Sequence, residues 1–154
     1  MFRDDEIHVA LEVLDAYFRQ PEQDYTALGA FTPGGTLLGY TCYGPTPCTH
    51  GTWDLYWIAV APRAQNAGIG TLLLQEVERR LARIHARLVL IETSARPLYE
   101  PTRAFYRQRG YAEVARVPDF YLDGEAKVIF AKRIEPNDGR ATSWNPGKIS
   151  CTGA

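Results

Sequence analysis

Residues 62–81, PRAQNAGIGTLLLQEVERRL, place two glycines directly before a long amphipathic helix. The apolar face of that helix is formed by residues that recur every three or four positions: Ile69, Leu73, Val77, Leu81 and Ile84. The first turn of a helix exposes unpaired N–H groups and the positive end of the helix dipole, so it attracts anions. Gly68 and Gly70 also carry no side chain that would keep a phosphate away from the backbone. The two glycines alone do not distinguish a phosphate loop from a tight turn that only starts a core helix.

The segments around this loop predict a sheet with helices packed on its faces. The aromatic and β-branched run TWDLYWIAV at 52–60 predicts a buried strand that ends just before the loop. Two β-type runs, 24–31 and 36–44, are separated by Pro33-Gly34-Gly35 and predict an antiparallel hairpin. The other predicted elements are a helix over 4–19, a strand over 87–94, a helix between Pro101 and Gly110, and strands over 111–117 and 125–134. This order favours an α+β fold or a mixed-sheet α/β sandwich.

Composition and charge limit the classes of function. The chain has 154 residues and fits one domain, which we place at 1–134. Residues 135–154 are rich in Pro, Gly, Ser and Asn, and we expect a loose tail with no role in the fold. A net charge of −1 without clustered Lys or Arg argues against nucleic acid as the main partner. The sequence shows no membrane-spanning run, no secretory signal, and three cysteines without metal-site spacing, so we expect a cytoplasmic protein without a metal.

The loop also differs from two common phosphate-binding motifs. A Walker loop would need a lysine before Thr71, and a dinucleotide loop would need a third glycine at a different spacing. Instead, Gln65-x-x-Gly68-x-Gly70 resembles motif A of the GNAT N-acetyltransferases, and AFYRQRGY at 104–111 resembles their motif B. The similarity extends in order over about residues 5–134. It implies a mixed, mostly antiparallel twisted sheet flanked by helices, and an enzyme that moves an acetyl group from acetyl-CoA to a primary amine by direct attack.

Three departures from the family pattern stand out. Asn66 occupies a position where many members have glycine, although asparagine tolerates the same left-handed backbone region. Tyr99 occupies a position where many members have asparagine. The sequence has no room for the strand that members usually carry before the first helix. Either the chain is truncated or the sheet begins one strand late, and the second case would leave an unprotected edge that favours pairing into a homodimer.

The resemblance implies which residues would hold acetyl-CoA. The strand backbone at Ile58, Ala59 and Val60 would pair with the pantetheine arm, and the hydroxyl of Thr71 would add a donor to the phosphate loop. The predicted pyrophosphate loop consists of Gln65, Asn66, Ala67, Gly68, Ile69, Gly70 and Thr71.

Two residues are predicted to move protons. The resemblance implies that Tyr106 protonates the leaving thiolate, and a phenol with a pKa near 10 holds its proton at neutral pH. Packing of Tyr106 with Phe105 against the sheet is the alternative. Asp54, a lone acid in an apolar strand, is the predicted base, because histone-type members place a glutamate there. A hydrogen-bonded aspartate without a catalytic role is the alternative for Asp54.

The loop before the last strand is predicted to border the acceptor. Asp119, Phe120 and Tyr121 lie in PDFYLDG, and acids there suit a cationic amine, although an ordinary hairpin loop fits equally well. The acceptor would be a small-molecule amine or a peptide N-terminus. An acyl-CoA-binding module of this fold without significant turnover is the alternative function.

Overall fold

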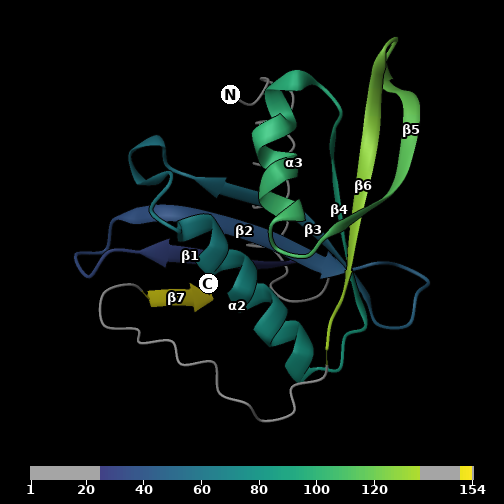
Figure 1. Ribbon diagram of the computed structural model, residues 1–154. Coiled ribbons are helices and arrows are strands. Elements are labelled where there is room, and N and C mark those ends of the chain that lie inside the picture. The colour runs from purple at the N-terminus through teal and green to yellow at the C-terminus, as the bar shows by residue number, and fades with distance from the viewer. Residues whose placement is uncertain (1–24, 136–149, 154) are drawn as a thin grey trace.

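The computed structural model describes residues 25–135 and 150–153 (Figure 1). The helix predicted over 4–19 lies outside these residues. The strands are β1 (Thr26–Phe31), β2 (Leu37–Pro45), β3 (Thr52–Val60), β4 (Leu88–Ser94), β5 (Ala112–Leu122), β6 (Glu125–Arg133) and β7 (Ser150–Gly153). They form a seven-stranded sheet in the order β5-β6-β4-β3-β2-β1-β7. Every neighbouring pair is antiparallel except β3 and β4, which confirms the predicted mixed, mostly antiparallel sheet.

The two α-helices of the described residues pack on the same face of this sheet. Helix α2 (Ile69–Arg83) crosses β1, β2 and β3, and α3 (Glu100–Arg107) follows β4 through a short 3-10 turn at Pro97–Tyr99. Four residues of the stripe predicted for α2, Ile69, Leu73, Val77 and Leu81, are buried together with Leu74, each at most 3% exposed. The fifth, Ile84, follows the last residue of the helix and is 57% exposed, so its prediction as part of the apolar face is wrong. Full burial of each of the buried side chains stabilises the fold by roughly 1.5–3 kcal/mol. Packing of this stripe therefore fixes the start of α2 against the sheet.

The sheet divides between its two parallel strands. β3 and β4 pair only from Thr52 to Leu55 and from Leu88 to Ile91, and beyond those residues each strand pairs only with its other neighbour. In Figure 1, β1, β2 and β3 run across the view, whereas β4, β5 and β6 stand upright. We call this divergence the fork. Beyond Leu55, the edge of β3 that faces β4 no longer pairs with β4.

The last strand corrects two expectations from the sequence. β7 pairs antiparallel with β1, from Leu28 opposite Gly153 to Phe31 opposite Ser150. The expectation of a tail with no role in the fold is therefore wrong for residues 150–153. The expected open edge next to β1 is also covered, so the argument for a homodimer through that edge no longer applies.

We expect removal of residues 150–154 to destabilise the fold and expose the edge of β1. Each lost backbone hydrogen bond costs roughly 0.5–1.5 kcal/mol, and unpaired edge strands associate with one another. Chemical denaturation should show a lower free energy of unfolding, and light scattering should show a larger mass than for the full chain. Equal stability and mass for both chains would contradict the role of β7.

The fifth strand is longer than the sequence predicts. β5 continues to Leu122, although Pro118 indicates a loop from that residue onward. A proline is tolerated here because β5 is an edge strand, whose outward N–H groups need no partner.

Candidate active site

The loop between β3 and α2 has the backbone conformation that an anion site requires. Asn66 and Gly68 both have positive φ, 61° and 81°, so asparagine does take the left-handed conformation here. The first hydrogen bond of α2 runs from the N–H of Leu72 to the carbonyl of Gly68 at 2.9 Å. The N–H groups of Ile69, Gly70 and Thr71 therefore have no acceptor within the helix. Residues 65–68 are exposed, which leaves this helix start open to a ligand.

The two glycines of the loop have different roles. A Cβ on Gly68 would meet nothing within 4 Å, so its side faces open space. A Cβ on Gly70 would lie 3.3 Å from Cε2 of Phe105, so Gly70 allows α3 to pack closely on α2. The amide of Gln65 donates to the carbonyl of Val60 across 3.5 Å, the limit of a hydrogen bond. Gly68 thus belongs to the candidate phosphate site. Gly70 lies in the same loop and lets α3, the helix that carries Tyr106, pack closely against it.

The predicted pantetheine strand lies along one side of the fork. Ile58, Ala59 and Val60 pair with β2, and none of the strands in the described part of the chain pairs with their opposite backbone edge. The register between β2 and β3 shifts at Tyr56, a bulge that redirects the backbone groups next to it. An extended amide chain in the fork would find these groups ready to form hydrogen bonds.

Tyr106 is buried in an aromatic cluster on the helix side of the sheet. It is 5% exposed, and its ring centre lies 5.4 Å from that of Phe105, 5.9 Å from that of Phe130 and 6.0 Å from that of Tyr111. Burial raises the pKa of its hydroxyl, so the group keeps its proton. Among the described residues, that hydroxyl has no hydrogen-bond partner, which is rare for a buried polar group. The packing alternative accounts for the ring of Tyr106 and leaves the hydroxyl unexplained.

Asp54 lies on the other face of the sheet, before the fork. It pairs with Leu90, whereas the next residue, Leu55, belongs to the buried core that contains Tyr106. Successive side chains of a strand point to opposite faces, so Asp54 points away from α2 and α3. Its carboxylate accepts a hydrogen bond from the Thr46 hydroxyl at 2.7 Å.

Glu92 is a second acid at the fork, and the sequence analysis did not identify it. It is the first residue of β4 after Ile91, the last one paired with β3. Its side chain is 51% exposed, and the ammonium of Lys127 lies 3.0 Å from its carboxylate. Like Asp54, it is a lone acid in an apolar strand, so the same signal was present in the sequence.

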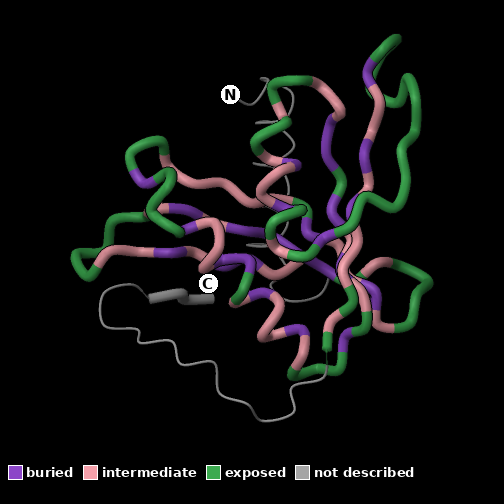
Figure 2. The backbone as a smooth tube through the Cα atoms, in the orientation of Figure 1, coloured by how far each residue is buried: buried purple, intermediate pink, exposed green. Residues whose placement is uncertain are grey.

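The hairpin of β5 and β6 projects from the rest of the molecule and is exposed along all of β5 (Figure 2). Asp119 serves the turn of this hairpin, since its carboxylate accepts a hydrogen bond from the N–H of Gly124 at 2.7 Å. Phe120 and Tyr121 pack edge to face with ring centres 4.9 Å apart. The ammonium of Lys127 lies 3.9 Å from the ring centre of Phe120 and so connects the hairpin to Glu92.

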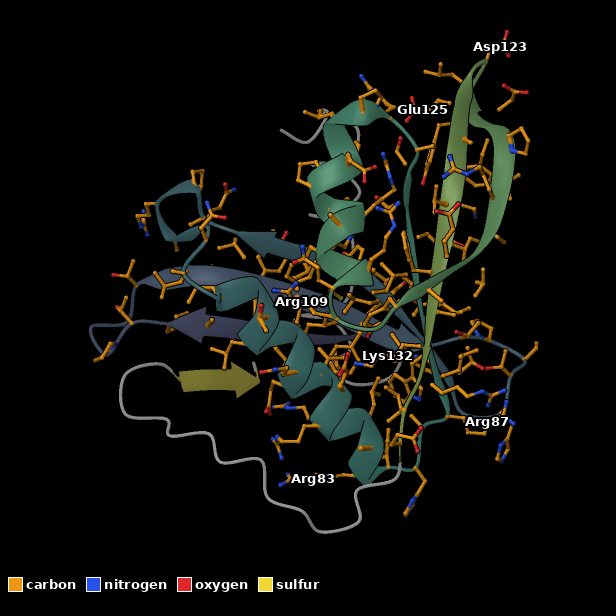
Figure 3. All side chains as sticks on the ribbon, viewed as in Figure 1. Arg83, Arg87, Arg109, Asp123, Glu125 and Lys132 are labelled. Carbon is orange, nitrogen blue, oxygen red and sulfur yellow. The ribbon has the colours of Figure 1, made fainter. Side chains whose placement is uncertain are left out.

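A buried polar cluster joins the end of β4 to α3. The guanidinium of Arg103 donates to the carbonyls of Ser94 and Arg96 at 2.6 and 2.9 Å. The Ser94 hydroxyl donates to Glu125, which lies near the base of the hairpin turn (Figure 3), at 2.8 Å. These bonds hold α3, and with it Tyr106, in a fixed position beside the fork. The sequence analysis did not single out any of these residues.

The described residues also bear on metal binding and on membrane insertion. Within 25–135 no three His, Cys, Asp or Glu side chains lie close enough to hold a metal ion. No helix in the described part of the chain is both long and apolar enough to cross a membrane.

The chain is similar to known acetyltransferases in sequence and in fold. The sequence profile of the acetyltransferase (GNAT) family matches residues 2–111. A structure from Desulfovibrio desulfuricans that is assigned to the GNAT family is 39% identical, with a TM-score of 0.84, and the match covers 88% of this chain and 85% of that one. No curated protein sequence matches the chain.

Two more distant structures share the fold. The ribosomal-protein-S18-alanine N-acetyltransferase of Escherichia coli is 16% identical, with a TM-score of 0.67 over 92% of this chain and 96% of that one. An aminoglycoside 6'-N-acetyltransferase complexed with coenzyme A is 20% identical, with a TM-score of 0.67 over 88% of this chain and 83% of that one. The profile match over residues 2–111 and the 39% identical structure from Desulfovibrio desulfuricans establish that the chain belongs to the GNAT family of acetyltransferases.

Proposed function

We propose that the protein transfers the acetyl group of acetyl-CoA to a primary amine by direct attack. The observation that carries this proposal is the buried Tyr106 hydroxyl without a partner, on a helix that packs against an open phosphate loop. The loop suits the donor, since the N–H groups of Ile69, Gly70 and Thr71 have no acceptor within the helix and Gly68 leaves space beside them. Acetyl-CoA would supply an activated acetyl thioester and a thiol leaving group.

The residues of the chain would divide the remaining tasks. Gln65, Asn66 and Ala67 would line the pyrophosphate together with the first turn of α2. The backbone of Ile58, Ala59 and Val60 would align the pantetheine arm, and N–H groups of β3 in the fork would polarise the thioester carbonyl. Tyr106 would hold the proton that the departing sulfur needs.

A carboxylate on the opposite face would take a proton from the acceptor ammonium. Asp54 and Glu92 both lie on that face, and Glu92 lies directly at the fork. We expect E92Q to lower kcat/KM by about 10²-fold or more, because loss of a general base typically costs 10² to 10⁴. D54N should have a smaller effect, since Asp54 lies in the paired part of β3. Profiles of kcat/KM against pH for both variants are the measurement, and a larger loss in D54N would assign the base to Asp54.

The acceptor site would lie between the fork and the β5–β6 hairpin, with Phe120 and Tyr121 as exposed aromatic contacts and Asp119 as a turn residue. The fold is shared with one enzyme that acts on an aminoglycoside and one that acts on a protein N-terminal alanine. An assay of released thiol should therefore test aminoglycosides, polyamines, amino acids and peptide N-termini.

Calorimetry with acetyl-CoA tests the donor, and no binding at high micromolar concentration would refute the proposal. Binding without transfer to any amine would favour an acyl-CoA-binding module instead.

A further inference from the structure

Arg109 connects the end of α3 to the first turn of α2 (Figure 3). Its Nε donates to the hydroxyl oxygen of Thr71 at 3.0 Å, and its Nη2 donates to the same oxygen. Its Nη1 donates to the carbonyl of Phe105 at 2.9 Å, and the guanidinium lies 3.7 Å from the centre of the Phe105 ring. The side chain is therefore held from three directions. The Phe105 ring beneath it is itself packed against Gly70.

These contacts determine how the Thr71 hydroxyl can act. A hydroxyl has one proton to donate and two lone pairs that accept. Arg109 occupies both lone pairs, so the proton must point elsewhere. No residue in the described part of the chain accepts a hydrogen bond from this hydroxyl. The result is an oriented donor without an acceptor, in the turn where the backbone N–H groups also lack acceptors.

We propose that Arg109 is a positioning residue for coenzyme A, acting through Thr71. By filling the lone pairs of Thr71, it fixes the hydroxyl as a donor to a phosphate oxygen at the start of α2. It also adds a positive charge next to that phosphate. This assignment rests on the proposed function, because it needs a donor with phosphates in the loop. If Arg109 only tied α3 to α2, its replacement would weaken the binding of any acetyl donor equally, with or without phosphates.

Binding of two acetyl donors tests the assignment. Acetyl-CoA carries phosphates, and S-acetylpantetheine carries none. R109Q and T71V should each weaken acetyl-CoA binding about 10-fold or more, as loss of a hydrogen bond to a charged group does. The double variant should bind no more weakly than either single variant, because the two residues act as one unit. Binding of S-acetylpantetheine, measured by competition, and kcat at saturating acetyl-CoA should stay unchanged.

Three further variants separate orientation from charge. R109K keeps the charge but cannot present the planar fork of N–H groups, so it should bind acetyl-CoA more weakly than the wild type. T71S should restore wild-type binding. R107Q, which removes an arginine of the same helix that pairs with Glu100, should leave acetyl-CoA binding unchanged.

The outcomes separate this assignment from the proposed function. A wild-type protein that does not bind acetyl-CoA refutes both. Wild-type binding together with R109Q binding of equal strength refutes only the assignment. Three other results would also overturn the assignment. If R109K binds acetyl-CoA as the wild type does, only the charge of Arg109 matters. If the losses in the double variant are additive, or if both donors bind equally more weakly and kcat falls, Arg109 has only a structural role.

Discussion

Replacing Tyr106 with phenylalanine should lower turnover by about 10²- to 10⁴-fold, the usual contribution of a positioned general acid. Affinity for acetyl-CoA should change little, because the ring keeps its contacts with Phe105, Tyr111 and Phe130. Stability should stay equal or rise, because the hydroxyl that is removed is buried without a partner. Steady-state kinetics and thermal unfolding of the same preparation measure the two effects. An activity loss accompanied by a lower Tm would instead indicate a structural role.

The pH dependence gives a second check on Tyr106. Burial raises its pKa in the folded protein above the ordinary value near 10. The phenol therefore stays protonated through neutral and mildly alkaline pH, and an alkaline fall in turnover within that range must come from another group. Because the folded pKa is the higher one, titration of this phenol leaves stability unchanged below the unfolded pKa and lowers it as pH rises from the unfolded to the folded pKa. Unchanged turnover in Y106F would remove Tyr106 from the mechanism.

The other large effect is expected at Gly68. Gly68 and Gly124 both have φ of 81°, and a Cβ on either would meet nothing within 4 Å. G68A and G124A should therefore lose similar stability from backbone strain, about 1 kcal/mol. Only G68A should weaken acetyl-CoA binding, by about 10- to 100-fold, since its methyl group would hinder hydrogen bonds to a charged phosphate.

Gly124 provides the control because it follows Asp123 in the turn between β5 and β6, and Figure 3 shows Asp123 at the tip of this hairpin, far from the start of α2. Calorimetry with acetyl-CoA and chemical denaturation should be run on both variants. If G68A binds as tightly as G124A, the phosphates do not approach the backbone at Gly68. Equal losses in both variants would indicate that strain alone weakens binding.

The parts of the site that the sequence predicts are those with local causes. The start of α2 follows from Gly68, whose positive φ ends the loop, and from the regular apolar stripe that begins at Ile69. Tyr106 follows from a motif contained in one short helix. Strand β3, which precedes the loop, follows from a run of β-branched and aromatic residues, and it spans the residues 52–60 that the sequence predicts.

The missed features depend on contacts across long stretches of sequence. Arg109 meets Thr71 across 38 positions, and Ser94 meets Glu125 across 31, and neither pair leaves a periodic signal. Glu92 is a candidate base only because it lies where β3 and β4 stop pairing, and the sequence does not show that position. Local rules also misjudged Pro118, because they do not reveal which strand forms the edge of the sheet.

The position of β7 has a consequence for the order of folding. Its pairing with β1 brings Leu28 opposite Gly153 and so closes a very long loop of the chain. Closure of such a loop costs conformational entropy before the new contacts can stabilise the fold. During synthesis, β1 emerges early and stays without its outer neighbour until residues 150–153 have left the ribosome. Docking of β7 should thus be a late step, which slows unfolding more than it speeds folding. A nascent chain that stalls before this segment would present the bare strand to other nascent chains.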